Sequence, residues 1–246
     1  MSGMSDDLFL GTAVTGITGN GPSPMSYGVG PMGRQYNFDI LPAALAANNL
    51  ATTQMPAGAG SLTLTAGAGV TLTTNALGNT IYSLDVARNV RVSSDADDTS
   101  VTFTVTGFDF YGQKMSEVIT GPNNATASGN KAFKSILSVA ISAAATGNIT
   151  VGTGDKFGLP FAITNIVYVS SAKWASALAA DAGTFVAADA TTATTTTGDV
   201  RGTYTPSSAS NGSRRLCMVL SLTAIACGPN ATRAGALGVD QNLAGQ

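Results

Sequence analysis

The clearest pattern along the chain is a strict alternation of apolar and polar residues between positions 100 and 106. Val101, Phe103 and Val105 alternate there with threonines. Successive side chains of an extended strand point to opposite faces, so the apolar residues would share one face. The stretch therefore predicts a half-buried antiparallel strand. Residues 113–120 are expected to return beside it as a hairpin, after a turn-like Phe-Asp-Phe-Tyr-Gly sequence.

Similar short patterns, separated by glycine, asparagine and proline, predict further strands. We expect them at residues 36–40, 61–66, 70–74, 81–86, 89–93, 135–142, 148–152, 163–170 and 216–226. The second and third are expected to form a hairpin around Gly67 to Gly69. Residues 131–142 also fit one face of a helix, but their β-branched content and the surrounding strands favour a strand from about residue 135. A brief helix is expected between Pro42 and Ala47, because proline suits the first helical turn and alanine favours helix. About ten short strands with little helix predict an all-β fold, an antiparallel β-sandwich resembling a jelly roll.

The remaining segments are expected to flank this domain. We predict that residues 1–36 form an extended N-terminal arm, because their glycines and prolines would interrupt a helix or a central strand. Residues 37–228 predict the β-sandwich domain, including a threonine- and alanine-rich loop or edge hairpin that faces outwards at about 187–210. Residues 229–246 carry little pattern and are expected to form a C-terminal tail.

Charged residues are scarce in this chain of 246 residues. They make up 11% of it, and the net charge is −2, whereas about 25% is usual. A neutral surface suits copies that pack closely, and nothing predicts the basic face that nucleic acid would require. No apolar run approaches the ~20 residues of a membrane-spanning helix. The acidic start lacks the basic region of a secretory signal, so we expect synthesis in a cytoplasm.

The chain also offers few of the residues that commonly carry out catalysis. The chain has no histidine, which removes the commonest general base and metal ligand. We therefore predict no enzyme activity, no catalytic residue and no cofactor. Carboxylate pairs such as Asp109 with Glu117, or Asp39 with Asp85, could hydrolyse glycosides only at a separation of ~5–9 Å, which sequence spacing does not establish.

The acidic cluster and the two cysteines of the chain each allow two interpretations. Asp95, Asp97 and Asp98 are interpreted as a turn between strands. The alternative is a calcium site, which would need about six to eight oxygen ligands, more than one loop supplies. Cys217 and Cys227 are interpreted as reduced, buried thiols, with a disulfide across a hairpin as the alternative.

Aromatic residues are the candidate anchors of a protein interface. We single out Tyr36, Phe38, Phe157, Phe161 and Trp174. Aromatic side chains often carry much of the binding energy between proteins. The alternative for each is ordinary packing in the core.

Two stretches of the chain carry a family resemblance. The first reads GVGPMGRQYNFDILP from Gly28. The second combines VTFTVTG from Val101, YGQKMSEVITGPN from Tyr111, KAFKSI from Lys131 and NITVGTGDKFGLP from Asn148. Together they resemble virion structural proteins of tailed bacteriophages, and some such proteins look like head decoration (cement) proteins.

The resemblance implies a non-enzymatic protein that binds and stabilises the head shell. Its expected partner is the major capsid protein, with no nucleic acid or membrane as partner. It is expected to form a homo-oligomer, a trimer, and to reside in the virion capsid. A neck or tail component of the virion is the alternative. A carbohydrate-binding module is a further one, which would need exposed aromatics with acidic and amide partners in a groove.

Overall fold

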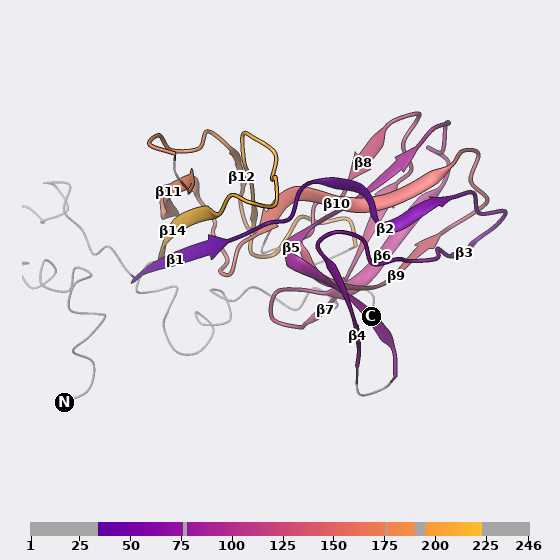
Figure 1. Ribbon diagram of the computed structural model, residues 1–246, viewed down its shortest axis with the longest axis horizontal. Helices are drawn as coiled ribbons and strands as arrows, with labels where there is room; N and C mark the ends of the chain where they lie inside the picture. The colour runs from indigo at the N-terminus through magenta and orange to yellow at the C-terminus, as the bar shows by residue number, and fades with distance from the viewer. Residues whose placement is uncertain (1–33, 76–77, 176, 190–194, 223–246) are drawn as a thin grey trace, which may run out of the picture.

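The computed structural model describes residues 34–75, 78–175, 177–189 and 195–222, so nearly all of the predicted arm and the whole predicted tail lie outside it. The described chain is almost entirely β, and its strands pair antiparallel (Figure 1). The predicted all-β, antiparallel class is therefore confirmed. No helix in this part of the chain is long and apolar enough to cross a membrane.

The strands form a small and a large sheet. The small sheet contains, in order, β1 (Arg34–Ile40), β14 (Leu216–Leu222) and β11 (Val169–Trp174). The large sheet contains β2 (Ala46–Gln54), β3 (Gly60–Ser61), β4 (Val70–Thr74), β5 (Thr80–Ser94), β6 (Thr102–Phe108), β7 (Lys114–Thr120), β8 (Thr126–Ser128), β9 (Phe133–Ile141), β10 (Ile149–Gly158), β12 (Thr184–Val186) and β13 (Thr203–Thr205).

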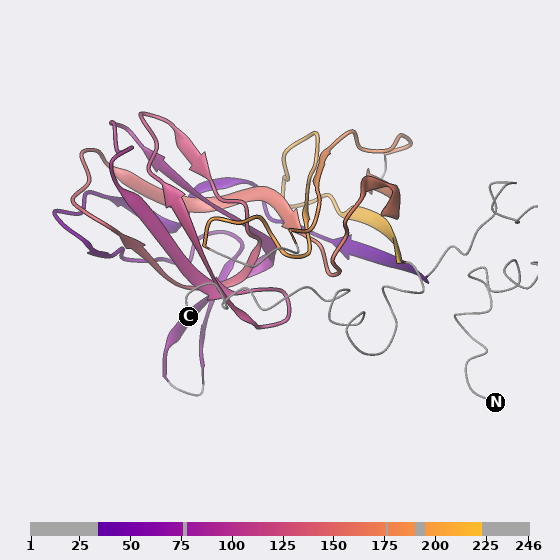
Figure 2. The same cartoon turned by 180° about the vertical axis from the view of Figure 1, so that it is seen from behind.

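The large sheet folds over along β5, its longest strand. The first half of β5 pairs with β4 and β9, and the second half pairs with β10 and β8. β9 continues into β6 and β7, whereas β10 also pairs with β2. The two halves enclose one apolar core, in which Val90, Val92, Phe103 and Phe133 are fully buried (Figure 2). The result is a β-sandwich, as the sequence predicted.

The central hairpin follows its alternating pattern. β6 and β7 pair continuously from Thr102 with Thr120 to Phe108 with Lys114. Phe103 and Val105 of β6 are buried, and its threonines are half-buried. Burial of one such apolar side chain contributes ~1.5–3 kcal/mol. Because a shift of one residue would turn these side chains away from the core, the alternating pattern favours the observed register of the hairpin.

A second core lies between the small sheet and one end of the sandwich. It brings Leu216, Met218 and Leu220 of β14 together with Phe157 of β10 and Tyr204 of β13. In Figure 1 the small sheet sits beside that end of the sandwich. β14 confirms the strand expected from residue 216, up to the last residue that the structure describes there.

The helix expected between Pro42 and Ala47 is wrong. Ala46–Gln54 is strand β2, which pairs with β10. The Asn49 side chain fixes this pairing: its oxygen accepts from the Thr153 N–H at 3.0 Å, and its amide donates to Thr153 Oγ1 at 2.9 Å. These long-range bonds override the helix propensity of the alanines.

The hairpin expected around Gly67 to Gly69 is also wrong. β4 pairs with β5, and β3, which overlaps the strand expected at 61–66 only at Ser61, pairs with β9. A side chain at Gly67 would meet Asn49 of β2 at 2.8 Å. The chain here packs across the sheet instead of turning back on itself.

Other strand boundaries differ as well. The strand expected at 163–170 begins only at Val169, because the Asn165 side chain accepts from the Val167 N–H at 3.0 Å and caps a 3-10 turn at Ile166–Tyr168. The strands expected at 81–86 and 89–93 form one strand, β5. The strand expected at 148–152 continues to the end of β10, through residues that were expected to be a loop.

Arg88 lies where β5 passes from β9 to β10, and its side chain is fully buried. Nε donates to the Gly154 carbonyl at 2.7 Å, and the two terminal nitrogens donate to Asp155 at 2.5 Å and to the Ala43 carbonyl at 3.1 Å. Asp85 lies 3.3 Å away. The pairing of β5 with both neighbours shifts register here. The guanidinium therefore supplies hydrogen bonds where the strand ladder is interrupted.

We expect Arg88→Met to lower the free energy of unfolding by ~3–5 kcal/mol, because Asp155 and Asp85 would lose their buried counter-charge. The matched control is Arg215→Met. Arg215 and its partner Asp39 are 51% and 42% exposed, and such exposed pairs contribute only ~0–1 kcal/mol. Urea unfolding followed by tryptophan fluorescence measures both losses. Equal losses would contradict the central role of Arg88.

Candidate functional site

Aromatic side chains from three separate segments meet on the surface where the small sheet adjoins the sandwich. Tyr36 and Phe38 come from β1, Phe110 and Tyr111 from the β6–β7 turn, and Phe161 from the segment after β10. The ring centroids lie 4.6 Å apart for Tyr36 and Phe161, 6.3 Å for Phe38 and Phe110, and 5.1 Å for Phe110 and Tyr111. We call these five residues the aromatic patch.

Local structure positions the rings of the aromatic patch. Tyr36 and Phe38 are two residues apart in a strand, so they point to the same side of the small sheet. In the β6–β7 turn, Asp109 accepts from the N–H groups of Tyr111 and Gln113, each at 2.8 Å. An aspartate that binds the backbone ahead of it fixes the shape of a turn.

A buried ion pair supports the same turn. Arg201 donates to Asp109 at 2.8 Å, with both side chains almost fully buried, and its guanidinium lies 5.4 Å from the centroid of the Tyr111 ring. The Tyr111 hydroxyl donates to the Pro160 carbonyl at 2.6 Å. Burial raises the pKa of this hydroxyl above its usual range, so it remains a donor at neutral pH.

The aromatic patch remains open to solvent. Phe110 is 40% exposed, Tyr111 is 43% exposed, and the other three rings are half-buried. Exposed apolar clusters often mark interaction sites, and aromatic residues are enriched in interfaces. The geometry therefore suits the docking of another protein surface.

The five aromatics singled out in the sequence divide between two places. Tyr36, Phe38 and Phe161 belong to the aromatic patch and also pack against the edge of the second core. Phe157 and Trp174 lie in the second core, where they are 0% and 5% exposed. In the described chain these two are packing residues and contribute no exposed ring.

Sequence reasoning missed Phe110 and Tyr111, which it assigned to a turn. The available signal was the turn itself, since residues 108–111 hold three aromatic side chains. A solvent-exposed turn of this kind ordinarily uses glycine, asparagine, aspartate or serine. Large rings in such a turn indicate packing contacts, which Phe110 makes with Phe38 and Tyr111 makes with Arg201.

The acidic residues Asp95, Asp97 and Asp98 form hydrogen-bonded turns. Asp98 is buried and accepts from Ser94 Oγ at 2.5 Å, and this and other hydrogen bonds lower its pKa although burial acts to raise it. Bonds from the Asn148 side chain and backbone lower the pKa of Asp95. Asp97 accepts from an N–H two residues further on at 3.1 Å. Within the described ranges, no three Asp, Glu, Cys or His side chains are grouped to hold a metal ion.

Several other charged groups are buried near the segment 195–202, which the sequence predicted to face outwards. Asp199 accepts from the N–H groups of Ala132 and Arg201 at 3.0 and 2.9 Å, and burial raises its pKa. Lys131 is fully buried, and burial lowers its pKa. These contacts hold the segment against the sandwich.

The carboxylates considered as catalytic pairs each have structural contacts of their own. Asp109 binds Arg201, Asp39 binds Arg215, Asp85 lies beside Arg88, and Glu117 accepts from the backbone of residues 130 and 131. Each of these carboxylates therefore has at least one partner within the fold.

Glu117, the only glutamate of the chain, is buried on the inner face of β7. Its Oε1 accepts from the N–H groups of Asn130 and Lys131. In the described chain Oε2 has no hydrogen-bond partner, and it lies so close to Gly129 that any side chain there would clash. Burial raises the pKa of Glu117 to about 7, against the opposing effect of the two backbone hydrogen bonds.

Comparisons with known proteins returned no match for this chain among family models, curated proteins or solved structures.

We expect the free energy of unfolding to fall as the pH rises through 7, and Glu117→Gln to remove part of that fall. The folded-state pKa of about 7 exceeds the ordinary 4.5, so the folded chain binds this proton more tightly than the unfolded chain. The stabilisation is fully present at pH values below the ordinary pKa of 4.5, and it is lost as the pH rises through the folded-state pKa of about 7. Between about pH 5 and pH 8 the loss is about 2–3 kcal/mol.

Urea unfolding of both proteins at the two pH values measures this effect. The stability difference between wild type and Glu117→Gln should change in favour of the variant at the higher pH. A difference that stays constant with pH would show that Glu117 does not titrate in this range.

Proposed function

We propose that this chain is a non-enzymatic structural protein of a tailed-bacteriophage virion, a decoration (cement) protein that binds the head shell and stabilises it. The observation that carries the proposal is the aromatic patch, a preorganised and exposed cluster of rings. The resemblance of the two sequence stretches to phage virion proteins supports the class. The major capsid protein is the proposed partner.

The physical properties of the described chain suit this role. Rings held by a buried ion pair and a hydrogen-bonded turn lose little conformational entropy when a partner covers them. A stable interface needs about 1,000 Å² of buried surface in total, so the aromatic patch would be its centre and neighbouring neutral residues its rim. The scarcity of charge allows identical copies, proposed to be trimers, to pack closely without repulsion.

Copy number tests the proposal directly. Quantitative mass spectrometry of purified virions, with the shell protein as internal standard, gives the ratio of the two chains. A ratio near unity supports decoration of the shell. A far lower ratio would assign the protein to the neck or tail instead, and absence from the particle would overturn the proposal.

We expect Phe110→Ser to weaken binding to undecorated heads at least tenfold, because loss of a central interface aromatic costs about 2 kcal/mol or more. Leu72→Ser is the control, since Leu72 is 54% exposed on β4, outside the aromatic patch. Co-sedimentation with heads measures both variants. Because Phe110 is exposed, the thermal unfolding midpoint of the Phe110→Ser variant should stay close to that of the wild type. Undiminished binding by Phe110→Ser would exclude the aromatic patch as the shell contact.

A further inference from the structure

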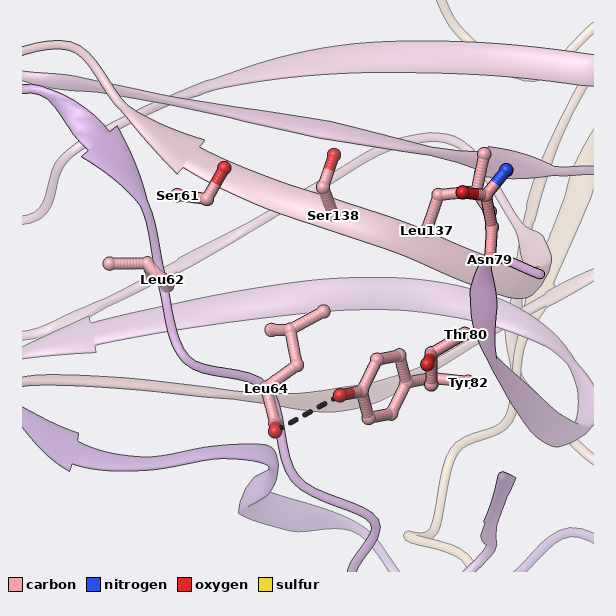
Figure 3. A pocket seen from close by; sticks show the side chains of 8 residues that line it. All are labelled: Ser61, Leu62, Leu64, Asn79, Thr80, Tyr82, Leu137 and Ser138. Atoms are coloured by element: carbon pink, nitrogen blue, oxygen red, sulfur yellow. Dashed lines mark hydrogen bonds between the residues drawn. The ribbon is translucent and has the colours of Figure 1, made fainter. Parts of the chain in front are cut away.

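A cavity of about 510 Å³ opens on the sandwich and shares no residue with the aromatic patch. Its lining comes from β3 and the coil after it, from Asn79 and the start of β5, and from the middle of β9 (Figure 3). Small-molecule sites typically have volumes of ~300–1,000 Å³. The cavity is therefore large enough for a small ligand.

The floor of the cavity is apolar and well fixed. Leu62 is buried in the sandwich core, and Leu64 and Tyr82 pack against that core. The Tyr82 hydroxyl donates to the Leu64 carbonyl at 3.1 Å, so the ring is held as one wall (Figure 3). A ligand with an apolar face would find a preformed surface here.

A β-bulge shapes the opposite wall. Thr106 pairs with Ser138, but the next residue of β6, Gly107, pairs with Ile136, so Leu137 is an extra residue in β9. Neighbouring residues of a regular strand point to opposite faces, yet Leu137 and Ser138 both line this cavity. Bulges redirect side chains in this way and are frequent beside functional sites.

The rim of the cavity is polar and uncharged. It carries the hydroxyls of Ser61, Thr80 and Ser138 and the amide of Asn79, and no lining residue is charged. A charged ligand would lack a counter-charge here. A wholly apolar ligand would cover rim groups without offering them hydrogen bonds, which is unfavourable.

We propose that this cavity binds a neutral saccharide unit, a pyranose ring with one apolar face. The C–H face of the sugar packs on Tyr82 and the leucines, and its hydroxyls exchange hydrogen bonds with the serine, threonine and asparagine side chains of the rim. The site goes beyond the proposed decoration function, because it would let the same protein attach to a glycan surface. Neither function requires the other.

Titration of the full-length, isotope-labelled protein with glucose, galactose and N-acetylglucosamine tests the proposal by amide chemical shifts. For at least one sugar we expect millimolar binding, with shifts centred on Thr80, Leu137 and Ser138. Asn79→Ala removes an exposed rim amide and should weaken binding at least tenfold. Tyr82→Ala should weaken it as much, whereas Tyr82→Phe, which keeps the ring, should retain most of it.

The matched control is Thr53→Ala. Thr53 lines a smaller hollow of about 290 Å³, with Asp95 and Asn148, whose lining is polar throughout. This variant should bind sugar like wild type. Shifts centred on Thr53 and Asn148, equal binding by Asn79→Ala, or no shift with any of the three sugars would each overturn the proposal. Binding to phage heads, measured on the same preparations, tests the proposed decoration function independently of the sugar site.

Discussion

A buried guanidinium is stable only when its charge and its five N–H donors find partners, and at Arg88 these partners come from distant parts of the chain. Asp85 belongs to β5 and Asp155 to β10, whereas Ala43 and Ser210 lie on two of the connections that run between the large and the small sheet, β1–β2 and β13–β14. One side chain thus fixes the fold of the sandwich and the position of the small sheet beside it. The aromatic patch, which takes rings from both sheets, depends on that position.

Several of the charged groups in the described chain are buried and have partners inside it. Arg88 supports the crossing of β5, and Arg201 supports the turn that carries Phe110 and Tyr111. The aromatic patch itself contains no charged side chain, so the contacts proposed for it are made by rings. Contacts of this kind are screened little by salt, in contrast to ion pairs between exposed charges. Binding through the aromatic patch should accordingly vary little with ionic strength.

Local periodicity was sufficient where neighbouring residues decide the structure. The β6–β7 hairpin and β1 follow from alternation, because each strand turns one face towards a core. β2 could not be predicted, since it depends on bonds between Asn49 and a residue 104 positions away. Three of the five rings of the aromatic patch had been singled out in the sequence as candidate anchors, a role that stays a prediction. The grouping of all five depends on contacts between sheets that no local pattern contains.

Two irregularities in the large sheet show how strand defects acquire different roles. At Arg88 the hydrogen-bond ladder of the strand is interrupted, and the buried Arg88 side chain donates to the Gly154 carbonyl in its place. At Leu137 the extra residue turns two successive side chains towards a cavity open to solvent. The first defect has its hydrogen bonds satisfied inside the protein and therefore serves stability. The second presents an apolar floor and polar rim to the outside, and this difference is the physical reason to look for a ligand there.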